Sequence, residues 1–191
     1  MADVGSGGPP GRTGQKALFL DRDGTLIVHH PYLGDPDKVE LLPNVGEGLA
    51  RLGKAGFALI LVTNQSGVAR GMLTEQTVQA VNKALADRLH DHGVSLQGTY
   101  YCPHLEEGSV AEYSRACQCR KPGLGMIQQA AQEHGIDLKR SFCIGDSLRD
   151  VERVGELGVR GILVAQEVSG SDPELVVVPS FEAAVRVVFL S

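Results

Sequence analysis

The sequence lacks three features that would place the chain in a membrane, outside the cell or on nucleic acid. No stretch approaches the roughly 20 apolar residues that a membrane-spanning helix requires. Residues 1–15 are rich in glycine and proline but lack the apolar centre of a signal peptide, so we expect a disordered tail and a cytoplasmic protein. No run of five or more basic residues occurs and the formal charge is −5, which argues against nucleic acid as a partner.

The remaining composition is that of an ordinary globular domain. Of 191 residues, 42% are hydrophobic and 21% are charged, which suits one domain, placed at residues 16–191. A domain of this size buries about 70% of its unfolded surface and needs no disulfide. We expect a monomer whose thiols stay reduced, so clustered cysteines indicate metal binding or catalysis before disulfides.

Strand-like and helix-like segments alternate along the chain. Apolar runs predict strands at residues 16–20, 57–62, 97–101, 141–144, 159–164 and 175–178. Helical spacing and capping residues predict helices at residues 45–55, 74–92, 122–134 and 148–157, and one that starts at Ser180. Strands separated by helices predict an α/β fold with a doubly wound, mostly parallel, Rossmann-like sheet.

Polar clusters follow four of the predicted strands, at residues 21–25, 63–66, 102–121 and 145–150. Ligands of such sheets bind at the carboxyl ends of the strands, so these clusters gather at one edge. Asp21 and Asp23 follow a buried strand, where paired carboxylates are costly unless a cation holds them. Hard oxygen ligands favour magnesium. A calcium loop fails because Leu26 and Tyr32 stand where it requires glycine and glutamate.

The third cluster carries the spacing of a zinc site. Cys102 and His104 are followed by Cys117 and Cys119, and three thiolates with one imidazole are typical of structural zinc. Alternatively, Cys102 and His104 are incidental and the other two cysteines form a redox pair. Zinc would supply folding energy to a loop with few apolar residues. Cys143 lies within an apolar run and is interpreted as a core residue.

The ordered set of four clusters resembles motifs one to four of the haloacid-dehalogenase-like phosphatases, over about residues 16–164. The resemblance implies that Asp21 attacks phosphorus and forms an aspartyl-phosphate. It implies that Asp23 protonates the leaving oxygen and then activates water. The other implied roles are magnesium binding by Asp21, Asp146 and the Asp23 carbonyl, phosphoryl stabilisation by Thr63 and Lys121, and orientation of Lys121 or a metal-bound water by Asp150.

The zinc loop narrows this resemblance. Asp-Arg-Asp-Gly-Thr, Thr-Asn-Gln-Ser-Gly, Cys-Pro-His and Cys-x-Cys-Arg-Lys-Pro are together similar to the D-glycero-D-manno-heptose 1,7-bisphosphate 7-phosphatases of nucleotide-heptose and lipopolysaccharide biosynthesis. Histidinol-phosphate phosphatases share the zinc loop and remain an alternative, as does a phosphatase for another small phosphate monoester. Both named families are nearly capless, which implies a minimal cap domain or none.

The same resemblance implies the substrate contacts. They are His29, His30, Pro31, Tyr32, Asn64, Gln65, Ser66 and Arg120, with Arg120 meeting the distal phosphate. His29 and His30 could instead be solvated loop residues. Ser147 stands where heptose enzymes commonly have lysine, which removes a phosphate-binding charge. A non-catalytic zinc-stabilised binding module would be expected to lose the nucleophile or the acid, yet both are present.

Overall fold

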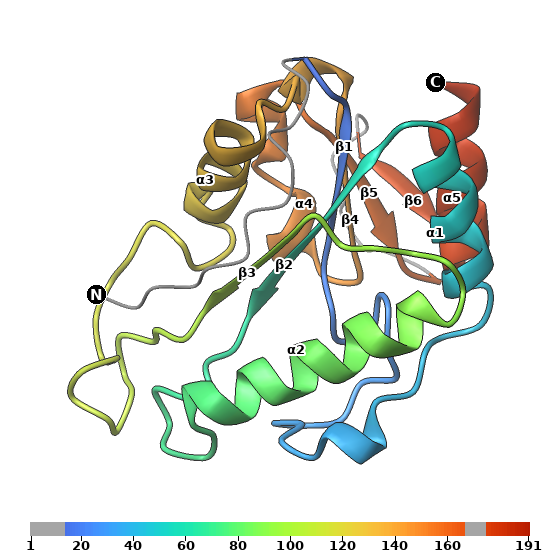
Figure 1. Cartoon of the computed structure of the whole chain (residues 1–191). Coiled ribbons are helices and arrows are strands. Elements are labelled where there is room, and N and C mark those ends of the chain that lie inside the picture. The colour runs from blue at the N-terminus through green and yellow to red at the C-terminus, as the bar shows by residue number, and fades with distance from the viewer. Residues whose placement is uncertain (1–13, 167–174) are drawn as a thin grey trace.

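The computed structural model describes residues 14–166 and 175–191 and contains one six-stranded sheet. Its strands are β1 (Ala17–Leu20), β2 (Ala58–Asn64), β3 (Gly98–Cys102), β4 (Phe142–Gly145), β5 (Arg160–Val164) and β6 (Val176–Val178). The order is β3-β2-β1-β4-β5-β6 and every neighbouring pair is parallel, which confirms the predicted fold class. The strand order reverses between β1 and β4 (Figure 1). Most of the predicted N-terminal tail, residues 1–13, lies outside the described residues.

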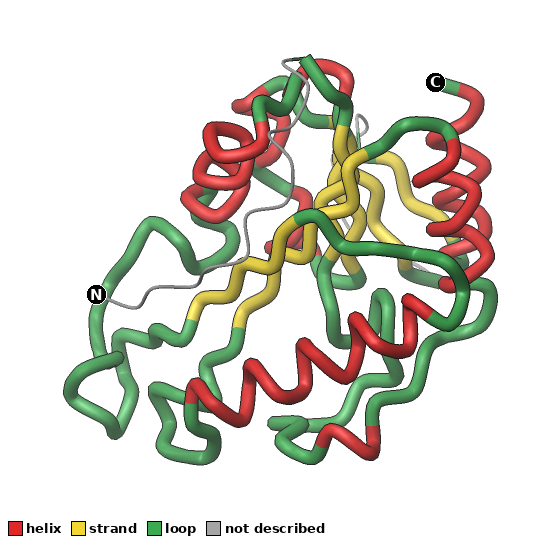
Figure 2. The backbone as a smooth tube through the Cα atoms, viewed as in Figure 1, coloured by secondary structure: helices red, strands yellow, loops and turns green. Residues whose placement is uncertain are grey.

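Helices cover both faces of the sheet (Figures 1 and 2). They are α1 (Val45–Lys54), α2 (Glu75–His90), α3 (Gly125–His134), α4 (Leu148–Val151) and α5 (Phe181–Leu190). Helices α1, α2 and α5 contribute to the larger apolar core on one face, whereas α3 contributes to a second core on the other. None of the helices in the described ranges has the length and apolar character needed to cross a membrane.

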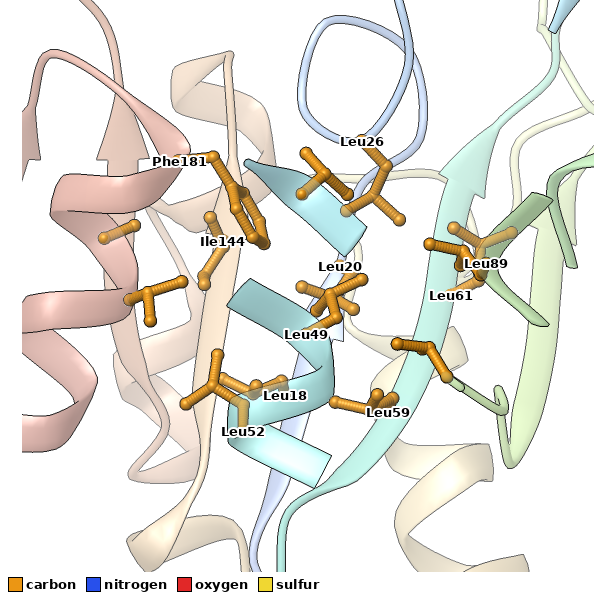
Figure 3. Packing of buried hydrophobic residues seen from close by; sticks show 14 of the residues in the cluster. Leu18, Leu20, Leu26, Leu49, Leu52, Leu59, Leu61, Leu89, Ile144 and Phe181 are labelled. Atoms are coloured by element: carbon orange, nitrogen blue, oxygen red, sulfur yellow. The ribbon is translucent and has the colours of Figure 1, made fainter. Parts of the chain in front are cut away.

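The side chains of β1 explain why the sheet is buried on both faces. Successive residues of a strand point to opposite faces. Leu18 and Leu20 therefore pack into the α1–α2–α5 core, while Ala17 and Phe19 pack into the α3 core. Figure 3 shows Leu18 and Leu20 packed against side chains of α1, including Leu49.

Two predicted helices differ from those observed. α3 begins at Gly125 instead of residue 122, because residues 118–124 form a turn in which the Gly125 N–H donates to the Gln118 carbonyl. The helix predicted at residues 148–157 is split into α4 and a 3₁₀ turn, Val154–Leu157. Both deviations lie beside the polar clusters, where loop geometry has replaced regular helix.

The segment between β1 and α1 stays close to the sheet. It is held by isolated bridges that join Asp23 to Ile27 and Ile27 to Leu41. Within residues 14–166 and 175–191, no separate cap domain is inserted, in agreement with the expected minimal cap. The carboxyl ends of the central strands are therefore reached directly from one edge of the domain.

Replacing Leu49 with alanine should destabilise the protein strongly. Leu49 is completely buried between α1 and the sheet, so truncation removes apolar contacts and leaves a cavity. We expect Leu49→Ala to lower the free energy of unfolding by about 2–5 kcal/mol in urea titrations. Lys54 is exposed on the same helix and is the matched control. Lys54→Ala should change the free energy of unfolding by about 0.5 kcal/mol or less. Equal losses in the two variants would contradict this packing.

Candidate active site

The register of β1 and β4 brings two carboxylates together at the switch in strand order. Leu20 pairs with Ile144, and the Asp21 N–H donates to the Ile144 carbonyl at 3.0 Å. The loops after the two strands therefore begin side by side, and carboxylate oxygens of Asp21 and Asp146 lie within 4.8 Å of each other. Gly24, at φ 84°, completes the tight turn after Asp21, and a Cβ atom there would overlap the Asp146 carboxylate.

Lys121 lies at the centre of the site and is only 5% exposed. Its Nζ is 2.5 Å from Asp21 Oδ1 and 2.8 Å from Asp150 Oδ1, and it donates to the Val62 carbonyl at 2.9 Å. Burial opposes the charged form of Lys121, but the two carboxylates outweigh it and raise its pKa. Burial raises the pKa of Asp21 to about 6, although Lys121 opposes this shift. One ammonium group thus neutralises only part of the buried negative charge.

A side-chain amide fixes the backbone of Lys121. Asn64, at the end of β2, accepts a hydrogen bond from the Lys121 N–H at 3.0 Å and donates to the Lys121 carbonyl at 3.1 Å. The sequence predicts that Asn64 contacts substrate. In the structure its amide group joins β2 to the loop that carries Lys121.

The chemistry of the remaining carboxylates fits a hard divalent cation. Oxygen atoms of Asp21, Asp146 and Asp150 lie within 4.8 Å of one another. Asp150 uses one oxygen for Lys121 and the other to accept the Ser147 N–H at 3.0 Å, which completes a capping box on α4. Burial and the charge of Asp150 raise the pKa of Asp146. Asp21 and Asp146 are therefore the side chains with oxygens free to bind magnesium.

Asp23 is held from two directions. Arg22, which is 1% exposed, donates through Nε to Asp23 Oδ2 at 3.1 Å and through Nη2 to Oδ1 at 3.2 Å. Gln65 donates to Asp23 Oδ2 at 2.9 Å and to the Thr63 hydroxyl at 3.0 Å. Sequence reasoning missed Arg22 because a charged residue beside an acidic motif is expected in solvent. Its position directly after a fully apolar strand was the available signal.

A cavity of about 550 Å³ opens above Asp21 and Asp23. The predicted contacts that line it are His29, His30, Pro31, Tyr32, Thr63, Asn64, Gln65 and Ser66, together with Asp146, Ser147 and Arg149. His29 and His30 are exposed at its rim. Arg120 is not among the lining residues, since its Nη1 donates to the His104 carbonyl at 3.3 Å. The structure therefore brings all the predicted substrate contacts to the cavity except Arg120. The lining also includes Arg22, Arg149 and Asp150, but not Lys121.

The four predicted zinc ligands converge. Cys119 Sγ lies 3.2 Å from the sulfur atoms of both Cys102 and Cys117, and 3.4 Å from His104 Nδ1. Thiolates around tetrahedral zinc lie roughly 3.8 Å apart for zinc–sulfur bonds of about 2.3 Å, so small displacements would admit the ion. Hydrogen bonding with Cys102 lowers the pKa of Cys119 to about 5. Convergence of all four groups favours zinc binding over a redox pair with incidental neighbours.

Known proteins resemble the chain in sequence and structure. A family model described as HAD-hydrolase-like matches residues 118–184. D-glycero-β-D-manno-heptose-1,7-bisphosphate 7-phosphatases from Yersinia pestis and Haemophilus ducreyi are 46% and 45% identical over 136 and 148 residues. These alignments cover 71% and 77% of this chain, and 72% and 81% of the relatives. A crystal structure of D,D-heptose 1,7-bisphosphate phosphatase from B. bronchiseptica, complexed with magnesium and phosphate, has a TM-score of 0.78 at 29% identity, covering 92% of this chain and 98% of that one.

Loss of one cysteine of the cluster should remove zinc. Cys117→Ser replaces a thiolate by a hydroxyl, which is a poor zinc ligand, so we expect bound zinc to fall from about one equivalent to below about 0.2, measured by mass spectrometry of the metal content. Cys143, buried in the core away from the cluster, provides the control variant Cys143→Ala, which should keep its zinc. Zinc-free wild-type protein, purified without chelator, would contradict the zinc site.

Proposed function

Because the chain belongs to the D-glycero-β-D-manno-heptose-1,7-bisphosphate 7-phosphatase family of haloacid-dehalogenase-like hydrolases, we propose that it removes the 7-phosphate of this β-anomeric sugar in nucleotide-heptose biosynthesis in the cytoplasm. The chain is a phosphoric monoester hydrolase. One observation supports the proposal most strongly: a buried Asp21 carboxylate, paired with Lys121, forms the floor of a cavity large enough for a sugar phosphate. That arrangement suits nucleophilic attack on a bound phosphate.

The reaction proceeds in two steps at Asp21. A carboxylate oxygen of Asp21 attacks phosphorus, the bond to the sugar oxygen breaks, and Asp23 gives its proton to that oxygen. Water then attacks the aspartyl-phosphate, Asp23 takes a proton from the water, and phosphate leaves with Asp21 regenerated. Asp23 suits both proton transfers because it lines the cavity and its side chain is 20% exposed.

Positive charge and hydrogen-bond donors surround the phosphoryl group. Lys121 is paired with Asp21 and Thr63 lines the same cavity, and both would stabilise the oxygens on which charge accumulates. Magnesium, held by Asp21, Asp146 and the carbonyl of Asp23, would neutralise the negative charge that phosphate brings to this acidic site. Zinc bound by Cys102, His104, Cys117 and Cys119 would have a structural role, because these four residues would supply all the ligands of a tetrahedral ion.

Arg149 is the cation best placed for the second phosphate of the substrate. Arg22 is engaged by Asp23, Lys121 by two carboxylates, and Arg120 by the His104 carbonyl. Arg149 is exposed, lines the cavity and has no ion-pair partner among the described residues. A guanidinium there would supply charge that Ser147, in place of the lysine common in heptose enzymes, does not.

A substrate comparison tests the proposed function. With magnesium present, we expect kcat/KM for the β-anomer of the heptose 1,7-bisphosphate to exceed values for histidinol phosphate and fructose 1,6-bisphosphate by at least about tenfold, measured as phosphate release. Asp21→Asn should reduce turnover of all three by at least about 10³-fold, because an amide is a poor nucleophile, and should leave fold and zinc content unchanged. A preference for histidinol phosphate would contradict the proposed substrate. An active Asp21→Asn variant would contradict the proposed mechanism.

Removing the charge of Arg149 should weaken recognition of the second phosphate. We expect Arg149→Gln to raise KM for the heptose 1,7-bisphosphate by about tenfold or more, with little effect on hydrolysis of the 7-monophosphate. Arg153, one helical turn away, exposed and paired with Glu156, is the matched control for loss of one surface charge. Equal effects of Arg149→Gln on both sugars would contradict this role.

A further inference from the structure

A buried arginine links the general acid to the far side of the site. Arg22 donates to the Asp23 carboxylate through Nε and Nη2, and to Asn82 Oδ1 through Nη1 at 2.8 Å. Asn82 lies on α2, sixty residues away in sequence, and is 6% exposed. Thus a chain of hydrogen bonds runs from a core-facing position of α2 to a carboxylate at the cavity.

The hydrogen-bond chain from Asn82 through Arg22 to Asp23 is unusual for a purely structural contact. Asn82 Nδ2 is buried with no hydrogen-bond partner among the described residues. An unpaired buried donor costs free energy, and an apolar residue of similar size would avoid this cost at a position facing the core. The hydrogen bond that Asn82 Oδ1 accepts from Arg22 is therefore the interaction that accounts for an asparagine at this position.

A forked guanidinium constrains a carboxylate more tightly than a single charge does. Nε and Nη2 of Arg22 contact the two oxygens of Asp23, which fixes the plane of the carboxylate as well as its position. Gln65 adds a third hydrogen bond from the β2 side. The hydrogen bonds found to the Asp23 carboxylate among the described residues all come from the side chains of Arg22 and Gln65.

We propose that Arg22 is a positioning residue, anchored by Asn82, that holds the Asp23 carboxylate in the orientation from which it exchanges a proton with the substrate oxygen. This inference rests on the acid–base role of Asp23 in the proposed function. It assigns to α2 a part in catalysis, although Asn82 does not line the cavity. Arg22 acts through Asp23 and needs no contact with the substrate.

The test compares two leaving groups. A sugar alkoxide leaves only with a proton from Asp23, whereas p-nitrophenolate leaves without one. For Arg22→Lys, which keeps the charge and loses the fork, we expect kcat/KM for the heptose bisphosphate to fall by at least about tenfold. We expect kcat/KM for p-nitrophenyl phosphate to change by less than about threefold. In an Asp23→Asn background, Arg22→Lys should cause no further loss for the sugar substrate.

Two more variants separate positioning from stability. Asn82→Ala keeps Arg22 but removes the acceptor that anchors it. We therefore expect kcat/KM for the heptose bisphosphate to fall more than kcat/KM for p-nitrophenyl phosphate, with a smaller difference than in Arg22→Lys. Lys83→Ala, at the next and exposed position of α2, should leave both substrates unaffected. Equal losses for both substrates in Arg22→Lys and Asn82→Ala, or an additive loss in the Asp23→Asn background, would overturn the inference alone. A wild-type protein that hydrolyses neither substrate would overturn the proposed function, and this inference with it.

Discussion

Lys121 places one positive charge between the carboxylates of Asp21 and Asp150, and all three groups are almost completely out of water. Without that charge, two buried carboxylates would repel each other and take up protons, and Asp21 would lose the ionised form that a nucleophile requires. Each neighbouring feature supports this arrangement. Asn64 holds the lysine backbone, and the α4 capping box orients Asp150.

The cysteine cluster and Lys121 belong to the same stretch of chain. Cys102 pairs in register with Asn64, and its carbonyl accepts the Gln65 N–H at 2.7 Å. Cys119, at the other end of the loop, is two residues before Lys121. A zinc ion that joins these cysteines would therefore fix both the end of β2 and the lysine that follows the loop. The link explains how a metal distant from the chemistry could still control catalysis.

Residues after β1 and β4 and residues after β2 have different roles in the site. Loops after β1 and β4 carry Asp21, the proposed nucleophile, and Asp146, and both are candidate metal ligands. Residues after β2 hold other groups in place: Asn64 holds Lys121, and Gln65 holds Asp23. Several residues that sequence reasoning treats as substrate contacts thus use their side chains within the protein. Arg149 and the segment from His29 to Tyr32 line the cavity and remain the proposed substrate contacts.

The sequence by itself determined the sheet, its parallel strands and the order of the polar clusters, because apolar runs and the acidic and cysteine motifs are local patterns. It also identified Asp21, Asp146 and Lys121 as candidates, because the ordered polar clusters that contain them resemble the motifs of a known phosphatase family. Only the tertiary structure decided which cationic side chains are bound within the protein and which face the cavity. The sequence assigned no role to Arg22 and predicted that Arg120 meets a phosphate. Strand register and loop closure instead direct Arg22 to Asp23 and Asn82, and Arg120 to the His104 carbonyl. Arg149 belongs to the polar cluster at residues 145–150, but the sequence does not single it out, because its place at the cavity depends on contacts between segments far apart in the chain.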